Sequence, residues 1–166
     1  KSHHYGLMLA AAQVCYLDPY PLPEYSMCGA VPLTAITRRL LDYRRAGMLD
    51  RVRMLLLTNC TFDGVIYNVE RVMEECLAIK PDLIFLWDEA WFAFARFGPT
   101  YRQRTGMAVA NNLRVKFKSS AHKKAYEAQQ ATLEGASEET LLKTRLIPPP
   151  TARVRVYTTQ STHKTL

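Results

Sequence analysis

The chain has 166 residues, of which 48% are hydrophobic and 22% are charged, and its formal net charge is +7. This length can build one domain with a substantial core, and the composition is ordinary for a soluble globular protein. No apolar run approaches the roughly 20 residues that a membrane-spanning helix needs. Residues 7–12 form a short apolar run without an A-x-A cleavage site, which argues against a secretory signal.

Local patterns predict three elements in the first quarter of the chain. Residues 5–13 are rich in Ala, Leu and Met and predict a helix. Residues 14–17 predict a short apolar strand that is ended by a Pro-rich turn. From Leu33 to Tyr43 the apolar residues recur at helical spacing, and Gly47 is a suitable helix stop.

The central part of the chain alternates between strand and helix. Residues 52–57 and 83–87 are apolar runs of the length expected for buried parallel strands. Between them, residues 65–79 place apolar side chains on one helical face. Asp63 and Gly64 are expected to form the turn before this helix and to cap it. Because strand, helix and strand follow one another, we expect an open, mainly parallel α/β sheet.

The pattern changes near residue 100. Residues 100–118 are polar and predict irregular structure, whereas residues 119–133 and 137–145 predict two surface helices, the second capped by Ser137. Residues 152–157 alternate Arg and Val and predict a further strand.

Most of the excess positive charge lies in this later part of the chain. We interpret residues 102–150 as a basic, largely helical insertion within one domain that spans residues 1–166. Since no base-reading motif accompanies the charge, we expect a solvated face, or a surface that meets acidic parts of a larger protein, rather than a nucleic-acid site. The basic residues are Arg102, Arg104, Arg114, Lys116, Lys118, Lys123, Lys124, Lys143, Arg145, Arg153 and Arg155.

The cysteines Cys15, Cys28, Cys60 and Cys76 are irregularly spaced and form no C-x-x-C pair. Neither a structural zinc site nor another metal site is therefore expected. Cys15 and Cys76 have apolar neighbours and are expected to be core residues. A reducing cytoplasm is the simplest compartment for this chain.

Polar clusters follow the three predicted strands at residues 58–64, 88–91 and 158–164. In open α/β sheets, ligands bind beyond the carboxyl ends of the strands, so this coincidence predicts a ligand site. Each cluster alone has a simpler interpretation, since an Asp after a strand often caps a helix and a His-Lys pair is often only solvated. Glu89 could be structural, and as a general acid it would need a raised pKa.

A resemblance to the bacterial ornithine/lysine/arginine decarboxylases rests on three stretches: Thr58-Asn59-Cys60-Thr61-Phe62-Asp63-Gly64, Asp88-Glu89-Ala90-Trp91 and Gln160-Ser161-Thr162-His163-Lys164. The last stretch is the most specific, because Ser-x-His-Lys is that family's cofactor-lysine motif. The resemblance covers about residues 1–101 and 152–166. It implies a fold type I enzyme with the three-layer αβα large domain of the aspartate aminotransferase type, built on a mainly parallel sheet and incomplete here.

The resemblance also implies a role for five residues. Lys164 would form a Schiff base with pyridoxal 5'-phosphate, and Asp88 would pair with the ring nitrogen. Ser161 would hydrogen-bond the phosphate, His163 would lie against the cofactor, and Trp91 would pack beside the site. A carboxylate at the ring nitrogen keeps it protonated, and the protonated ring accepts the electrons left by loss of CO2. The expected reaction converts arginine, lysine or ornithine to an amine, as in polyamine metabolism.

The family has a His-Lys-Ser stretch, of which Lys1-Ser2 would be the last two residues. Its His and the phosphate-binding loop would then precede residue 1, so we expect a fragment that is inactive alone. His3 and His4 are not expected as cofactor ligands, because they begin a helix. The whole enzyme is expected to bind an amino-acid substrate as a homodimer or higher homo-oligomer, without nucleic-acid or membrane partners.

Three alternatives stay open at this point. The first is another fold type I pyridoxal phosphate enzyme, such as an aminotransferase or a different lyase. The second is a non-catalytic basic module that binds nucleic acid or an acidic partner. The third is a degenerate scaffold that retains the fold without its chemistry.

Overall fold

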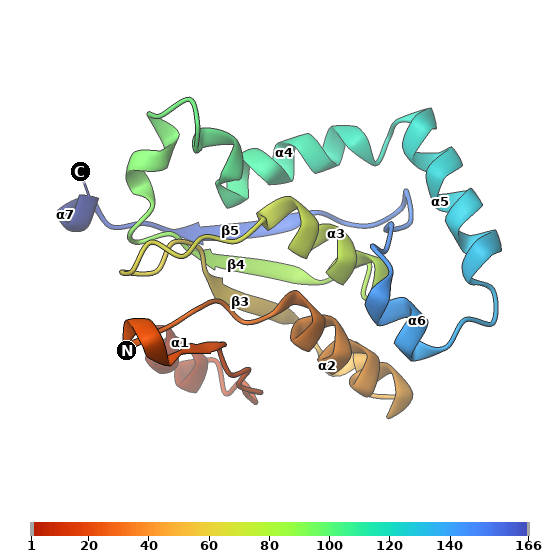
Figure 1. Ribbon diagram of the computed structural model, residues 1–166, viewed down its shortest axis with the longest axis horizontal. Coiled ribbons are helices and arrows are strands. Elements are labelled where there is room, and N and C mark those ends of the chain that lie inside the picture. The colour runs from red at the N-terminus through yellow and green to blue at the C-terminus, as the bar shows by residue number, and fades with distance from the viewer. Residues whose placement is uncertain (1, 166) are drawn as a thin grey trace.

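The computed structural model describes residues 2–165 and shows a mixed α/β fold around a three-stranded parallel sheet (Figure 1). The helices are α1 (Ser2–Leu9), α2 (Leu33–Arg45), α3 (Val69–Ile79), α4 (Gly106–Lys116), α5 (Ser120–Leu133), α6 (Glu138–Lys143) and α7 (Thr162–Thr165). The strands are β1 (Pro21–Leu22), β2 (Met27–Cys28), β3 (Met54–Thr58), β4 (Ile84–Asp88) and β5 (Arg155–Thr159). Short 3-10 turns occupy Pro23–Tyr25, Leu49–Arg51, Ala93–Arg96 and Arg102–Arg104.

The main sheet has the strand order β3-β4-β5, with both pairs parallel. Parallel strands were expected, and β4 lies in the centre of the three. The expectation that residues 52–57 are buried holds only in part, because β3 lies at the edge of the sheet, where Met54 and Thr58 are exposed.

The helices α2, α3 and α4 lie side by side against one face of the sheet (Figure 1). Strand residues that alternate toward this layer, among them Phe85 and Trp87, are about 1% exposed. They share one apolar core with residues of the helices. The helical members of this core include Ile36, Leu40, Leu41, Met73, Cys76, Leu77, Val109 and Leu113.

The region between residues 100 and 118 was predicted to be irregular, and that prediction is wrong. It forms a 3-10 turn and the helix α4, which buries Val109, Ala110 and Leu113. The helix packs against β5, so tertiary contacts compensate for its weak apolar pattern. The two helices predicted after it are confirmed as α5 and α6, and the Ser137 hydroxyl caps α6 as expected.

The first 30 residues differ from their predicted structure. The first described helix ends at Leu9, and residues 14–17 form no strand because no neighbouring strand pairs with them. A short antiparallel ladder of β1 and β2 follows instead. Cys15 is exposed, which corrects the expectation that it is a core residue, whereas Cys76 is fully buried.

The helix α3 begins later than predicted, at Val69, and its cap differs from the prediction. The Asn68 side chain accepts the Arg71 N–H and caps the helix, so Asp63 is not the cap. Gly64 does form the expected turn, with a φ of 81° that favours glycine. Within residues 2–165, no helix combines the length and apolar character needed to cross a membrane.

Gly106 offers a sharp test of the packing between α4 and the sheet. A Cβ at this position would lie 2.7 Å from Trp87 Cδ1 and 3.2 Å from Thr158 Cγ2. Gly106→Ala should therefore lower the free energy of unfolding by about 1–3 kcal/mol, measured by urea denaturation. The matched control is Gly98→Ala, because a Cβ there has no atom within 4 Å. Equal stability of the two variants would contradict this packing.

Candidate active site at the strand ends

The carboxyl ends of the three parallel strands meet at one edge of the sheet. Thr58 is paired with Asp88, and Asp88 is paired with Thr159, so the last residues of β3, β4 and β5 lie level. Figure 1 shows α1 and α7 near this end of the sheet, far from α5 and α6. The three polar clusters of the sequence are therefore neighbours in the fold.

The Asp88 carboxylate accepts hydrogen bonds on both oxygens. Its Oδ2 lies 2.9 Å from His3 Nε2, and its Oδ1 accepts the Ala90 N–H and the Thr159 hydroxyl, each at 3.1 Å. Burial raises the pKa of Asp88. The three hydrogen bonds and the nearby imidazole lower it by more than burial raises it, so the pKa of Asp88 lies below its ordinary value. The side chain is thus held as an oriented anion at neutral pH.

His3 is a site residue that sequence reasoning missed. Its side chain comes from α1 and is 26% exposed, and it reaches the end of a strand 85 residues away. Because an ionised carboxylate can only accept, Nε2 is the donor in this contact. The sequence pointed to this part of the chain only through Lys1-Ser2, which resembles the end of the family's His-Lys-Ser stretch. Lys1 lies outside the described residues.

The predicted cofactor lysine lies beside the predicted aromatic residue. Lys164 Nζ is 5.2 Å from the centre of the Trp91 ring, in a cation–π geometry. Trp91 in turn meets Phe62 edge to face, with ring centres 5.1 Å apart. The loop after β3, the turn after β4 and the segment after β5 therefore each contribute a side chain here.

Ser161 and His163 also come together, with Ser161 Oγ 2.8 Å from His163 Nδ1. His163 and Lys164 are exposed at the start of α7. Among the described residues, no hydrogen bond or ion pair joins Asp88 to either of them or to Ser161. The expected site residues thus do not form one connected cluster: Asp88 contacts His3, Ala90 and Thr159, Lys164 lies over Trp91, and Ser161 pairs with His163.

Glu89 lies in this turn and is fully buried, although the sequence left its role open. Its Oε1 accepts hydrogen bonds from Asn59 Nδ2 at 2.9 Å and from Gly106 N–H at 2.7 Å. Burial raises the pKa of Glu89, and the charge of the nearby Asp88 raises it further. The hydrogen-bond donors lower it by less, so the pKa of Glu89 lies above its ordinary value. Two adjacent carboxyl groups therefore have pKa values displaced in opposite directions.

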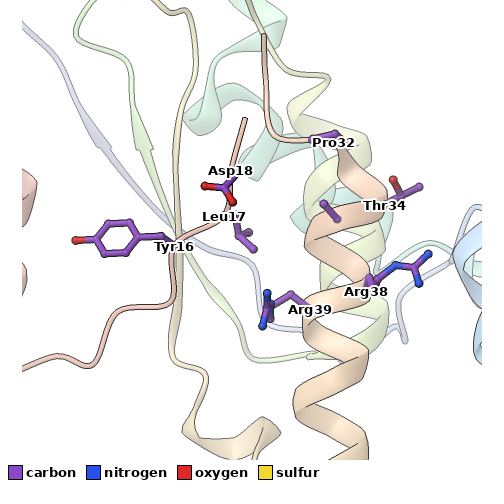
Figure 2. A pocket seen from close by; sticks show the side chains of 8 residues that line it. Tyr16, Leu17, Asp18, Pro32, Thr34, Arg38 and Arg39 are labelled. Atoms are coloured by element: carbon purple, nitrogen blue, oxygen red, sulfur yellow. The ribbon is translucent and has the colours of Figure 1, made fainter. Parts of the chain in front are cut away.

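A surface hollow of about 370 Å³ lies elsewhere, between α2 and the segment that precedes β1 (Figure 2). Figure 2 shows Arg38 and Arg39 on the helix and Tyr16, Leu17 and Asp18 on the facing segment. None of the expected site residues lines it. The candidate active site is thus the polar edge of the sheet and not this hollow.

The groups at the sheet edge fit part of a pyridoxal phosphate site. The His3 imidazole on Asp88 is a planar heteroaromatic ring that presents an N–H to a carboxylate, as a protonated pyridine ring would. An exposed amine and hydroxyl groups from Thr159 and Ser161 lie on neighbouring segments. Asp88 could hold the ring nitrogen and Lys164 could carry the cofactor.

We expect replacement of His3 to change how stability depends on pH. The Asp88 carboxylate stabilises the fold above its unfolded pKa of about 3.9, and this contribution is lost as the pH falls through the lower folded pKa. His3→Ala removes one donor and should cost about 1 kcal/mol at neutral pH, with less effect in acid. Urea denaturation between about pH 3 and about pH 7 measures this. His4→Ala is the exposed control, and an equal loss in both variants would contradict the contact.

Curated relatives of the chain are amino-acid decarboxylases by name. Lysine decarboxylase LdcA of Pseudomonas aeruginosa is 28% identical over 118 residues, which are 68% of this chain and 15% of that protein. The biodegradative arginine decarboxylase of Escherichia coli K12 is 33% identical over 116 residues, 64% of this chain and 15% of that protein. A lysine decarboxylase of Hafnia alvei is 26% identical over 110 residues, which are 65% of this chain and 14% of that protein.

The chain thus spans about 15% of the length of these relatives. No solved structure matches it. The family model described as the Orn/Lys/Arg decarboxylase major domain matches residues 1–147, from α1 through α6, and stops before β5. The Ser161–Lys164 motif lies beyond this match. Since the match covers most of the sequence, the chain belongs to the Orn/Lys/Arg decarboxylase family and forms part of its major domain.

Proposed function

We propose that this chain is part of a pyridoxal phosphate-dependent decarboxylase that converts arginine, lysine or ornithine to an amine and CO2. The observation that carries the proposal is the ionised Asp88 carboxylate, which holds an aromatic N–H donor at the end of the central strand. Membership of a decarboxylase family adds the reaction class. The enzyme would act in the cytoplasm, in polyamine metabolism, as a homodimer or higher homo-oligomer with a complete three-layer αβα domain.

When bound, pyridoxal phosphate supplies a ring that accepts the electron pair left by the departing carboxylate. The role of Asp88 would be to keep a proton on the ring nitrogen, because an anion beside that nitrogen favours its protonated form. The Thr159 hydroxyl and the Ala90 N–H keep Asp88 Oδ1 oriented, which leaves Oδ2 for the ring. His3 would have to move from Oδ2 or share it.

Lys164 would bind the cofactor covalently, and Trp91 would position its amine by the cation–π contact. Lys164 would have to leave this contact before its amine could bind the cofactor. Ser161 would donate to the phosphate, and His163 is near enough to orient that hydroxyl.

Ion pairs within the protein argue against the basic module as the main function. Lys116 Nζ lies 2.7 Å from Glu70 and 2.6 Å from Glu74, and Arg145 also pairs with Glu74 at 2.9 Å. These cations bind the helical layer together, so part of the positive charge is neutralised internally. Two rivals remain. A different fold type I enzyme such as an aminotransferase would form a keto acid instead of an amine with CO2, and a degenerate scaffold would form no product.

In the full-length protein, Lys164→Ala should abolish the release of amine and CO2 from arginine, lysine and ornithine, because no other amine would hold the cofactor. Mass spectrometry of the products measures this. Lys123→Ala is the control, since Lys123 is an exposed lysine on α5. Decarboxylation that persists in folded Lys164→Ala would contradict the assignment.

A further inference from the structure

Glu89 has the surroundings of a residue with a specific task. It is 0% exposed, its Oε1 accepts two hydrogen bonds, and its Oε2 has no hydrogen-bond partner among the described residues. The Gln160 side chain is close enough to lower the pKa of Glu89, but it makes no hydrogen bond of normal geometry. A half-satisfied buried carboxyl group is costly, so its retention at the edge of a binding site calls for an explanation.

One of the two donors is the first residue of α4. The Thr105 side chain makes no capping hydrogen bond to α4, and its hydroxyl donates to Arg102 O. The Gly106 N–H donates to Glu89 instead, so a carboxyl group 17 residues away caps this helix. Glu89 thereby attaches α4 to the turn after β4.

The other donor attaches the loop after β3 to the same turn. Asn59 is fully buried; its Nδ2 donates to Glu89, and its Oδ1 accepts the Tyr67 N–H at 3.3 Å. Its own backbone N–H donates to Asp88 O at 2.9 Å. The Glu89 N–H donates to Thr159 O at 2.8 Å, which connects the turn with the end of β5.

We propose that Glu89 is a positioning residue that sets Asp88 and Trp91 for cofactor binding by holding α4 and the loop after β3 against the end of β4. The part concerning the cofactor rests on the function proposed above. Asp88 immediately precedes Glu89 and Trp91 follows it by two residues, so a shift of this side chain moves both. Because Oε2 has no hydrogen-bond donor among the described residues, a buried anion at Glu89 would carry a larger desolvation penalty than the neutral, protonated side chain.

The proton on Glu89 gives the proposal a signature in pH. Burial raises the folded pKa, so between the unfolded pKa of about 4.3 and the folded pKa only the folded state keeps the proton. Stability must then fall as the pH rises through this interval. Glu89→Gln keeps an acceptor for both donors without a titrating group, so it should lack this component of the pH dependence.

The test uses the full-length protein with Glu89→Ala, Glu89→Gln and the exposed control Glu134→Ala. Pyridoxal phosphate affinity is measured from the visible absorption of the bound cofactor, without substrate. Hydrogen exchange of peptides covering residues 88–94 and 105–113 is measured in the protein without cofactor. We expect Glu89→Ala to weaken affinity by about tenfold or more and to speed exchange in both peptides, whereas Glu89→Gln and Glu134→Ala stay near wild type.

Wild-type affinity and exchange in folded Glu89→Ala would overturn the proposal, as would Glu89→Gln behaving like Glu89→Ala. If Glu89→Ala does not fold, Glu89→Gln decides through pyridoxal phosphate affinity and exchange: values near wild type are expected, and weaker affinity with faster exchange in both peptides overturns the proposal. Its profile of stability against pH tests only whether Glu89 is protonated in the folded state. A wild-type protein that binds no pyridoxal phosphate contradicts the proposed function instead. The exchange of the 105–113 peptide then tests the attachment of α4 independently.

Discussion

The level register of β3, β4 and β5 is the constraint on which the candidate site depends. Because parallel strands run in one direction, their carboxyl ends meet at one edge, and here Thr58, Asp88 and Thr159 end side by side. Thr159 can therefore donate to Asp88, and the loops that follow the three strands can meet around Trp91. A shift of one strand by one residue would reverse its buried and open faces and separate these groups.

Two adjacent carboxyl groups use this edge in opposite ways. Asp88 alternates away from the helical layer, is partly open, and is held as an anion by donors on both oxygens. Glu89 is enclosed, and burial favours its neutral form. In the proposed site, these opposite displacements of neighbouring pKa values would allow Asp88 to face a cationic ring nitrogen while Glu89 fixes the backbone.

The sheet and α3 could be predicted because their apolar residues repeat with a clear period and bury a continuous core. The helix α4 could not, since its buried residues Val109, Ala110 and Leu113 are interspersed with polar residues, and its apolar face becomes apparent only from its contacts with β5 and α3. The position of Asp88 after an apolar strand predicted a ligand site, and the roles expected of Asp88 and Trp91 came from the family resemblance. His3 and the burial of Glu89 escaped prediction, because both depend on contacts between segments distant in sequence.

The central claim is that Lys164 and Asp88 belong to one pyridoxal phosphate site. The most direct measurement is to add pyridoxal phosphate to the full-length protein, reduce with borohydride and identify the modified peptide by mass spectrometry. We predict a pyridoxyl group on Lys164 in the wild type and a weaker yield when Asp88 is replaced by Asn, because the ring nitrogen then loses its anion. Modification of a different lysine, or none in the folded wild type, would contradict the claim.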